Sequence, residues 1–479
     1  MPTFRARLRL GRRRPAPGGA NPLLEGRIAP TLLGLSVPMI FAMLVVTGFG
    51  LVDMIYLGRY SRVAMAAIQL AFPVSYLLMS LASALGTAAT SLCSRLLGAG
   101  DERQARNLVL HVLVLVGGLT LVITPLARLF LRGALAPMHA EPAVLAGALT
   151  YARIAYWGTF FALLPQAASA LFRGEGDTMT PFRILALALV VNIVLAPLLI
   201  FGPGPLPELG VAGAAWATVG SFAVASLLVT RELLNPRRKV RLERSAWRWD
   251  PSLMRGMASV GLPALAANLA MPLSVELINR QLTPYGTGAL AAFGAGSRLL
   301  NFVFLPTLGI SLSMLIMVGQ NHGAGLRERV RRITWSTVVS AIAFMAVLAV
   351  PVLLFPRAAL GAFTNQRDII TLAVPLILWV TPARPMLSVV NITAYWFQAR
   401  GQGLAGMLPN FLMRVILEPL GVFVGLRVAG RLLGAWAGMC VGDVVGGVCC
   451  LALLAWRLRV YARGGAAAAE EQISLAYRT

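Results

Sequence analysis

The sequence predicts an all-α membrane protein with twelve transmembrane helices in two six-helix lobes. Three observations support this prediction. The 479-residue chain is 58% hydrophobic and 13% charged, with a mean hydropathy of +0.75, whereas soluble proteins carry about 25% charged residues. Twelve apolar segments, long enough to cross a bilayer at about 20 residues each, are spread along the whole length. The two halves of the chain also resemble each other.

A basic tail (1–30) precedes the first apolar segment and lacks the short apolar core and cleavage site of a targeting peptide. A basic linker (231–251) then separates the first lobe (31–230) from the second lobe (252–458), and a further tail (459–479) ends the chain. We expect the twelve helices at 31–58, 64–92, 107–131, 145–172, 183–202, 209–230, 252–282, 287–319, 332–355, 369–397, 407–427 and 433–458.

The basic residues indicate the orientation of these helices. Positive charge gathers in the connections that follow even-numbered helices, above all in the linker, whereas "PGPLPEL" (203–209) and "PYGTG" (284–288) contain none. Because cytoplasmic loops carry an excess of arginine and lysine, both ends of the chain are predicted to be cytoplasmic. The net charge of +24 therefore belongs to loops beside anionic lipid. We expect no nucleic-acid partner, since no soluble domain is present to bind one.

An internal repeat appears when the chain is aligned with itself without gaps so that Pro38 falls on Pro263. In this alignment, here named the repeat register, "AMAAIQLA" (64–71) matches "ALAAFGAG" (289–296). The offset holds an even number of spans, so both halves have the same topology. Parallel repeats of this kind are a transporter architecture.

Motifs for catalysis are lacking. The three histidines lie far apart, and the chain contains neither a zinc-binding HExxH, nor a G-x-S-x-G nucleophile motif, nor a nucleotide-binding P-loop. The four cysteines fall in or beside apolar runs and form no CxxC pair, which indicates packing residues. We therefore predict no enzyme activity, no metal and no cofactor, and an ion gradient as the energy source.

Asp53, in "FGLVDMIYLGRY" (49–60), is unexpected near the end of a long apolar run. An ionised carboxylate in hydrocarbon costs several kcal/mol unless it is paired or neutralised. One interpretation is a carboxylate solvated at the extracellular end of the helix or paired with Arg59. The other is a group that binds and releases a coupling proton, because burial favours the protonated form of a carboxylate.

Six motifs together resemble a known family: "GLVDMIYLGR", "AAIQLAFPV", "RGEGDTMTP", "NIVLAPLLIFG", "GVAGAAWAT" and "MVGQNHGAG". They are similar to the MATE family, the multidrug and toxic compound extrusion transporters, and within it to the prokaryotic DNA-damage-inducible branch. The resemblance implies two six-helix lobes and export of organic compounds coupled to inward proton or sodium flow.

The resemblance also implies a cation-coupling cluster in the first lobe. The family's positions fall on Asp53, Asn192 and Thr218, while Gln166 replaces an asparagine of the fourth helix. The chain departs from the family at Ala196, where a second carboxylate is usual. Sodium needs several oxygen ligands, whereas a proton needs one titratable group, so we expect proton coupling rather than sodium coupling.

In the second lobe "RVILEP" aligns with "NIVLAP" through the prolines, which places Glu418 opposite the vacant Ala196. Glu418 is therefore a candidate for proton coupling or for attracting a cationic substrate. The alternative is that Arg414, four residues earlier on the same helix face, simply neutralises it. Glu276 and Arg280 form a second such pair and are candidates for the cavity wall.

The combined prediction is a secondary-active antiporter that exports organic, cationic or amphipathic compounds in exchange for protons. We expect it to act as a monomer in the inner membrane of a bacterium or archaeon, with a small organic substrate and membrane lipid as partners. The rival is a flippase for lipid-linked oligosaccharide or peptidoglycan precursors, which needs a cationic cavity. Its candidate arginines, all in apolar stretches together with the unassigned Asp443, are Arg280, Arg298, Arg384 and Arg414.

Overall fold

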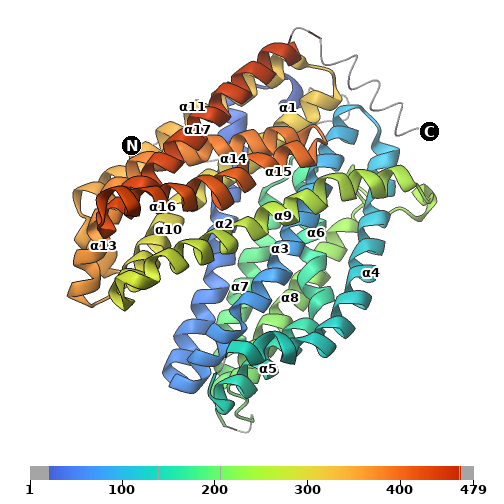
Figure 1. Cartoon of the computed structure of the whole chain (residues 1–479). Coiled ribbons are helices and arrows are strands. Elements are labelled where there is room, and N and C mark those ends of the chain that lie inside the picture. Colours follow the sequence, from blue (N-terminus) through green and yellow to red (C-terminus); the bar gives the residue numbers. More distant parts are fainter. Residues whose placement is uncertain (1–20, 139, 205–206, 463, 465–479) are drawn as a thin grey trace, which may run out of the picture. The chain divides into compact units, whose positions relative to one another are not determined.

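The structure, a computed structural model, describes residues 21–138, 140–204, 207–462 and 464. Every regular element among these residues is a helix (Figure 1). Helices satisfy all backbone hydrogen bonds within one segment, as a segment surrounded by lipid must. Most of the predicted tails, at 1–20 and 465–479, lies outside the described residues.

The chain divides into two compact units. The N-terminal unit comprises Phe41–Gly261, and the C-terminal unit combines the described residues up to Ile40 with those from Leu262 onward. Two helices, α2 (Ile28–Tyr60) and α9 (Pro251–Leu282), pass from one unit into the other. The remaining helices of the N-terminal unit are α3 (Arg62–Gly98), α4 (Glu102–Leu135), α5 (Pro142–Trp157), α6 (Thr159–Glu175), α7 (Met179–Phe201) and α8 (Val211–Leu233), with short 3-10 helices at Ala136–Met138 and Arg244–Ala246.

The C-terminal unit begins with a single helical turn, α1 (Pro22–Glu25), capped by the side chain of Asn21. Its other helices are α10 (Thr287–Gly323), α11 (Arg327–Leu354), α12 (Pro356–Gly361), α13 (Arg367–Val380), α14 (Arg384–Ala399), α15 (Gly403–Phe411), α16 (Glu418–Ala429) and α17 (Leu432–Ala462). Short 3-10 helices lie at Thr283–Tyr285 and Thr381–Ala383, and a π-helical segment (Leu412–Leu417) joins α15 to α16.

Ten helical stretches of the described chain are long and apolar enough to cross a membrane. Two more are interrupted: α5 and α6 meet at Gly158, and α15 continues into α16 through the π-helical segment. Each part of these two is shorter than a full span of about 20 residues. Counted as pairs they complete twelve transmembrane helices, so the predicted fold class is confirmed.

The compact units are shifted along the sequence relative to the predicted lobes. Residues 31–40 belong to the C-terminal unit, where Ile40 packs against Gly309 of α10. Residues 252–261 belong to the N-terminal unit, where Gly256 and Gly261 pack against Leu92 and Ala88 of α3. Packing within α2 and α9, rather than the loops that precede these helices, therefore sets where each unit begins.

Part of the predicted N-terminal tail is held in place. The Asn21 amide donates to Oε1 of Gln320 at 3.3 Å, and the Asn321 amide donates to the Leu23 carbonyl at 2.9 Å. Arg329 donates to the carbonyl of Gly26. Residues 21–26 are thus attached to α10 and α11 of the same unit, immediately before α2 begins.

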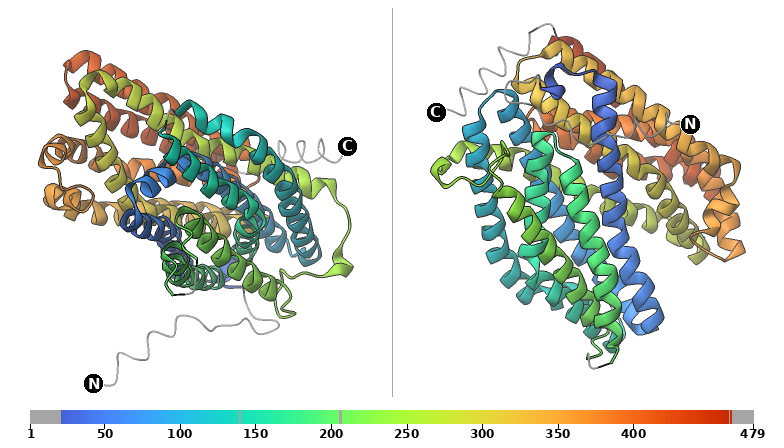
Figure 2. Two further views of the ribbon diagram at one scale, coloured as in Figure 1. Left: turned by 90° about the horizontal axis from the view of Figure 1, so that it is seen from below. Right: turned by 180° about the vertical axis from the view of Figure 1, so that it is seen from behind.

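Small residues allow neighbouring helices to approach closely. The helices α7 and α8 run side by side (Figure 2), and a Cβ added to Gly213 would collide with the carbonyl of Leu199. In the C-terminal unit a Cβ on Gly438 of α17 would collide with the carbonyl of Gly421 on α16. Interfaces rich in small residues are typical of membrane helices, where close van der Waals packing replaces the hydrophobic effect.

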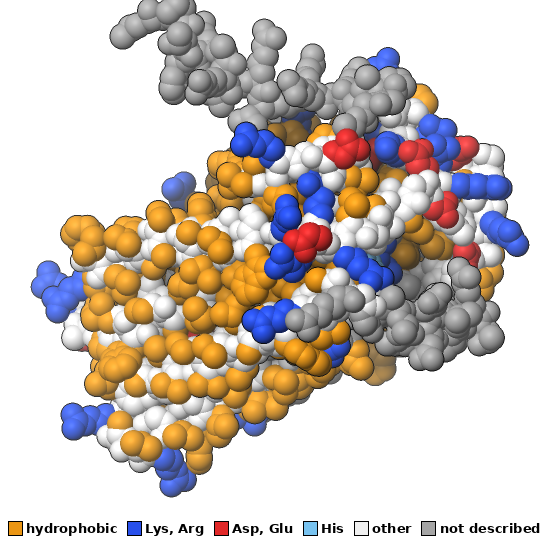
Figure 3. Space-filling view, turned by 90° about the horizontal axis from the view of Figure 1, so that it is seen from above, with side chains coloured by type: hydrophobic (Ala, Val, Ile, Leu, Met, Phe, Trp, Pro, Cys, Tyr) orange, Lys and Arg blue, Asp and Glu red, His pale blue; other side chains and the backbone are white. Residues whose placement is uncertain are grey.

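Many large apolar side chains are exposed on the outer surface, where a membrane protein contacts lipid. Leu121, Leu129 and Leu227 are 70% exposed or more, and Figure 3 shows broad areas covered by apolar side chains. Exposed apolar surface on this scale is typical of a protein that faces hydrocarbon rather than water. The chain is a multi-pass membrane protein.

Candidate functional site

Asp53 of α2 lies in the interior of the N-terminal unit, with 3% of its surface exposed. Its Oδ2 accepts a hydrogen bond from the Tyr151 hydroxyl of α5 at 3.1 Å, and its Oδ1 has no donor. Among the described residues no ion pair reaches Asp53, and Arg59 is exposed. The interpretation of Asp53 as a carboxylate that is solvated or paired with Arg59 is therefore wrong, because the carboxylate turns inward to a neutral hydroxyl.

Two further predicted residues join this carboxylate. The Thr218 side chain of α8 lies beside both Asp53 and Tyr151. The amide of Asn192, a fully buried residue of α7, donates to the Thr218 hydroxyl at 3.4 Å, while its own Oδ1 has no donor. Asp53, Tyr151, Asn192 and Thr218, here named the Asp53 cluster, thus hold one carboxylate, two hydroxyls and one amide.

Gln166, the fourth predicted member, does not join the Asp53 cluster. It is half-buried on α6, and the described residues give it no hydrogen bond to Asp53. Tyr151 of α5 takes this place instead. Nothing in the sequence indicated this role, since Tyr151 is one of nine tyrosines and lies in no recognised motif.

Proline shapes α7 next to the Asp53 cluster. Pro197 has no backbone N–H, which leaves the carbonyl of Ile193 without its usual helical donor. The Tyr56 hydroxyl, three residues after Asp53 on α2, is directed at that carbonyl at 3.5 Å. The contact joins α2 to α7 one turn of helix from Ala196. Ala196 is the position where the family resemblance implies a second carboxylate.

Glu418 anchors a second buried cluster, in the C-terminal unit. With 1% of its surface exposed, it receives hydrogen bonds from Arg414 at 3.0 and 3.3 Å and from the Ser274 hydroxyl of α9 at 3.1 Å. Arg384 of α14 lies 3.8 Å from the same carboxylate. The predicted pair of Glu418 with Arg414 therefore exists, but it is part of a larger network.

Asp443 of α17 completes this network. It is fully buried, and one of its oxygens lies 3.8 Å from Nη1 of Arg384, the same nitrogen that lies 3.8 Å from Glu418. Neither oxygen of Asp443 has a hydrogen-bond donor, nor does Nε of Arg384 have an acceptor. Ser274, Arg384, Arg414, Glu418 and Asp443, here named the Glu418 cluster, bring two arginines and two carboxylates together inside the unit.

The π-helical segment positions Arg414 and Glu418. It covers Leu412–Leu417, and Pro419 follows at the start of α16. Its wider turn locally changes the direction of side chains relative to an α-helix, and single π turns in helices frequently occur at functional sites. No such segment occurs in α7, the corresponding helix of the N-terminal unit, which is α-helical throughout its described length.

The internal repeat relates the two clusters. In the repeat register Asp443 corresponds to Thr218, and Arg384 corresponds to Thr159, the first residue of α6 after the break at Gly158. Both clusters therefore draw on the first, fifth and sixth helices of their halves, and on the interrupted fourth. Applied to polar residues as well as to motifs, this register would have drawn attention to Asp443 from the sequence, because its counterpart Thr218 was already a predicted member of the first cluster.

The other predicted cavity residues lie elsewhere. Glu276 and Arg280 form an exposed ion pair of 2.9 Å on α9, with 55% and 74% of their side chains exposed. Arg298 is exposed on α10. Of the four arginines weighed for a pyrophosphate site, Arg280, Arg384 and Arg414 have carboxylate partners, so these arginines do not form one converging cationic site.

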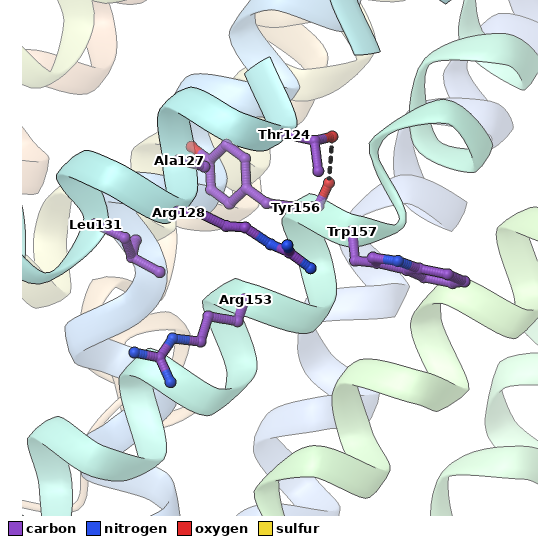
Figure 4. Close-up of a pocket in the computed structure, with 7 residues that line it drawn as sticks. All are labelled: Thr124, Ala127, Arg128, Leu131, Arg153, Tyr156 and Trp157. Carbon is purple, nitrogen blue, oxygen red and sulfur yellow. Dashed lines mark hydrogen bonds between the residues drawn. The ribbon is translucent and has the colours of Figure 1, made fainter. Parts of the chain in front are cut away.

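A small pocket on the N-terminal unit contains no member of the Asp53 cluster in its lining, although it shares α5 with Tyr151 (Figure 4). It is lined by residues of α4 and α5, including the exposed Arg128 and Arg153, with Thr124 donating to the Tyr156 carbonyl at 3.1 Å. Its lining contains no acidic group and no histidine or cysteine. The pocket therefore offers no group for proton exchange.

Comparison with known proteins shows that each half of the internal repeat matches the same protein family. The sequence profile of the MatE family matches residues 38–198 and again residues 263–423, two segments that begin at equivalent positions of the repeat register. A protein named FAD transporter from Shewanella oneidensis is 28% identical over 420 residues, covering 86% of this chain and 92% of the relative. A probable multidrug resistance protein, NorM, from Thermotoga maritima is 25% identical over 87% of this chain and 90% of its own length.

Solved structures agree with the fold. The outward-facing structure of a multidrug resistance MATE family transporter of the MOP superfamily superposes with a TM-score of 0.88 and 24% identity, covering 94% of this chain and all of that chain. A structure from Pyrococcus furiosus, described as a MOP superfamily transporter with reverse polarity of its binding pocket, gives 0.87 at 24% identity, covering 94% and 99%. At this identity the likeness supports the architecture of twelve helices in two lobes.

Proposed function

Because the chain belongs to the MatE family of membrane transporters, we propose that it is a secondary-active exporter of organic compounds that takes up protons in exchange through Asp53. The observation that carries this proposal is a buried carboxylate with one unpaired oxygen and neutral partners. An ionised carboxylate in such a place is costly. A proton on Oδ1 removes the charge without breaking the hydrogen bond from Tyr151.

The Asp53 cluster favours a proton over sodium. Asp53 supplies its only carboxylate, and Ala196 stands where a second one would be. The remaining oxygens belong to two hydroxyls and to the Asn192 amide, a weak set for replacing the hydration shell of a metal ion. Protonation needs one group alone, and it would let Tyr151 and Thr218 change partners as the helices α2, α5 and α8 repack.

Export of drugs or other organic compounds is supported by the relatives named as multidrug proteins. The flippase alternative is less favoured, because three of its four candidate arginines are engaged by carboxylates. We propose an inner-membrane location with both ends in the cytoplasm, from the distribution of basic loops. FAD is the second cargo to test, since one relative carries that name.

The test is efflux of a fluorescent organic cation from proteoliposomes under an imposed proton or sodium gradient. We expect the proton gradient to drive efflux and Asp53→Asn to reduce it to the rate of protein-free liposomes. Tyr151→Phe should slow efflux by about one to two orders of magnitude, because a hydrogen bond to an ionised group is worth about 1.5–3 kcal/mol. Asp368→Asn, which changes an exposed carboxylate at the start of α13, should have no effect.

Other outcomes contradict separate parts of the proposal. Efflux driven by sodium would overturn proton coupling. Proton-driven efflux that is indifferent to Asp53→Asn would overturn the role of Asp53. If neither gradient moves the cation or FAD, while lipid-linked oligosaccharide crosses the bilayer, the flippase alternative replaces the exporter.

A further inference from the structure

Asp443 is the least satisfied charged group in the Glu418 cluster. It is fully buried in α17, and both of its oxygens lack a hydrogen-bond donor. Glu418, by contrast, accepts from Arg414 and Ser274. An ionised aspartate here would have lost its hydrating water, and its nearest cation would be Arg384, which lies 3.8 Å away and equally close to Glu418. Burying an ionised group without hydrogen bonds is costly, so the site favours a neutral Asp443.

The neighbour of Asp443 shows where a proton would go. The carboxyl groups of Asp443 and Glu418 lie within reach of a side-chain hydrogen bond. Two ionised carboxylates are both acceptors, so this contact becomes a hydrogen bond only when one of them carries a proton. Glu418 already has donors for its oxygens, whereas Asp443 has none. The proton therefore fits on Asp443, which then donates to Glu418.

We propose that the C-terminal unit holds a second proton site, in which a proton bound to Asp443 forms a hydrogen bond to Glu418. A hydronium ion supplies the proton: one of its O–H bonds breaks, one O–H bond forms on Asp443, and a water molecule is left. The charge of the cluster rises from zero to one positive unit. Arg414 keeps its 3.0 Å contact with Glu418, and Arg384 keeps Glu418 at 3.8 Å as its remaining carboxylate.

The charged groups around Asp443 favour a proton over a metal ion. Arg384 approaches from α14, Arg414 from the π-helical segment and Glu418 from α16, while Cys440 lies one turn earlier on α17. Two guanidinium groups repel a metal cation, and among the described residues no group of three or more acidic, histidine or cysteine side chains could hold one. A proton needs only the two carboxyl groups.

The surrounding helices add no competing charge next to this pair. The charged residues of α13 (Arg367 and Asp368) are exposed in its first turn. Those of α11 lie within 327–332, at the start of that helix. Tyr461 lies near the C-terminal end of α17, several turns beyond Asp443. The guanidinium groups of Arg327 and Arg400 lie over its ring, so these charges are also distant from Asp443 along the helix.

This site is separate from the proposed coupling at Asp53. It lies in the other compact unit and uses other residues, so it stands even if Asp53 has no role in transport. Its position follows from the repeat, since Asp443 corresponds to Thr218 of the Asp53 cluster. If both sites exchange protons, each half of the chain carries one, and the number of protons moved per cycle can exceed one.

The test is infrared spectroscopy of the full-length protein in lipid during a pH titration, with aspartate carrying ¹³C in its carboxyl group. We expect a carbonyl band of protonated aspartate that remains in Asp53→Asn, disappears as the pH is raised, and shifts with the ¹³C label. Asp443→Asn should remove this band, whereas the exposed-site control Asp368→Asn should leave it unchanged.

The labelled Asp53→Asn protein keeps the proposal open to refutation even if Asp443→Asn fails to fold. Absence of a labelled band above about pH 5, where ordinary aspartates are ionised, would overturn the second site, as would a band that no pH removes. A second variant, Glu418→Gln, removes the negative charge beside Asp443 and leaves it as the only carboxylate near Arg384 and Arg414, so the band should disappear at a lower pH. A band insensitive to both Glu418→Gln and Asp443→Asn would belong to another aspartate and would overturn the assignment.

Discussion

The two buried clusters solve the same physical problem in opposite ways. The Asp53 cluster holds a single carboxylate among hydroxyls and an amide, with no cation. The Glu418 cluster holds two carboxylates and two arginines. Both occupy corresponding helices of the repeat that the two family matches define. The same scaffold therefore accommodates either one switchable charge or a network of four.

The two clusters differ in whether they remain stable when a carboxylate loses its charge. Neutralising Asp53 leaves only neutral groups that can still hydrogen-bond one another. Neutralising Glu418 takes from Arg414 the carboxylate that accepts its hydrogen bonds at 3.0 and 3.3 Å, whereas Asp443 accepts no such bond, and a desolvated charge that loses its hydrogen-bonded partner is expensive. The Asp53 cluster is suited to changing its charge during a transport cycle, whereas the Glu418 carboxylate is needed to hold the C-terminal unit together.

The largest effect should come from breaking the Glu418 cluster. Glu418→Ala leaves Arg384 and Arg414 without their shared carboxylate, and breaking a buried ion pair costs about 3–5 kcal/mol. Asp53→Asn keeps the shape and an acceptor for Tyr151, and it should cost less than about 1 kcal/mol. Thermal unfolding in detergent, followed by tryptophan fluorescence, compares the two. Equal losses of stability would contradict the contrast between the clusters.

The next largest effect should come from disturbing the close helix packing that positions the residues of each cluster. Gly213 and Gly438 are equivalent in the repeat register, and each lies against a carbonyl of the preceding helix. Gly438→Ala should separate α16 from α17 and cost about 1–3 kcal/mol, as overpacking does, and Gly213→Ala should do the same to α7 and α8. Thermal unfolding measures the loss, and the Asp443 infrared band should change only in Gly438→Ala.

A glycine with free space around it provides the control for this pair. Gly118 of α4 has nothing within 4 Å of an added Cβ. Gly118→Ala should therefore leave stability unchanged or raise it by about 0.5–1 kcal/mol, because alanine is the better helix former. If Gly118→Ala lowered stability as much as Gly438→Ala, the close contact between α16 and α17 would not be the cause of the loss in Gly438→Ala.

The smallest effect should come from the linker, which belongs to neither cluster. Asp250 accepts from the Ser252 N–H at 2.8 Å and from Gln104 of α4 at 3.1 Å, while its own N–H donates to Nε2 of the buried His111 at 3.1 Å. Hydrogen bonds from Ser252 hold the pKa of Asp250 below its ordinary value of 3.8. A lowered pKa stabilises the folded form above that value, and the stabilisation is lost as the pH falls through the lower, folded-state value.

We therefore expect the part of the linker between α8 and α9 (234–250) to be attached to α4 at neutral pH and to loosen under acid conditions below pH 3.8. The contribution should stay under about 1 kcal/mol, because solvent screens a partly exposed carboxylate. Hydrogen exchange of the linker amides, compared between wild type and Asp250→Asn, measures it. The Asp443 infrared band should not change in this variant; if it does, the clusters are coupled to the linker.

The sequence predicted the helices more fully than the sites. All twelve predicted spans are present, because a long apolar run in a membrane must become a helix. The grouping of Asp53 with Asn192 and Thr218 was expected from the family resemblance and is present in the structure. Gln166 was wrongly expected in this group and Tyr151 was not foreseen, since helix periodicity does not say which of several polar residues on neighbouring helices meet.

The amino-acid sequence by itself determined the fold class, the repeat and the presence of charges inside apolar segments, because these follow from hydropathy and from self-similarity along one dimension. Only the tertiary structure decided which charges on different helices are partners. Arg384, Glu418 and Asp443 belong to three different helices, yet one guanidinium nitrogen lies 3.8 Å from both carboxylates. Such pairings depend on how closely α14, α16 and α17 approach and how each is rotated, and close packing sets both.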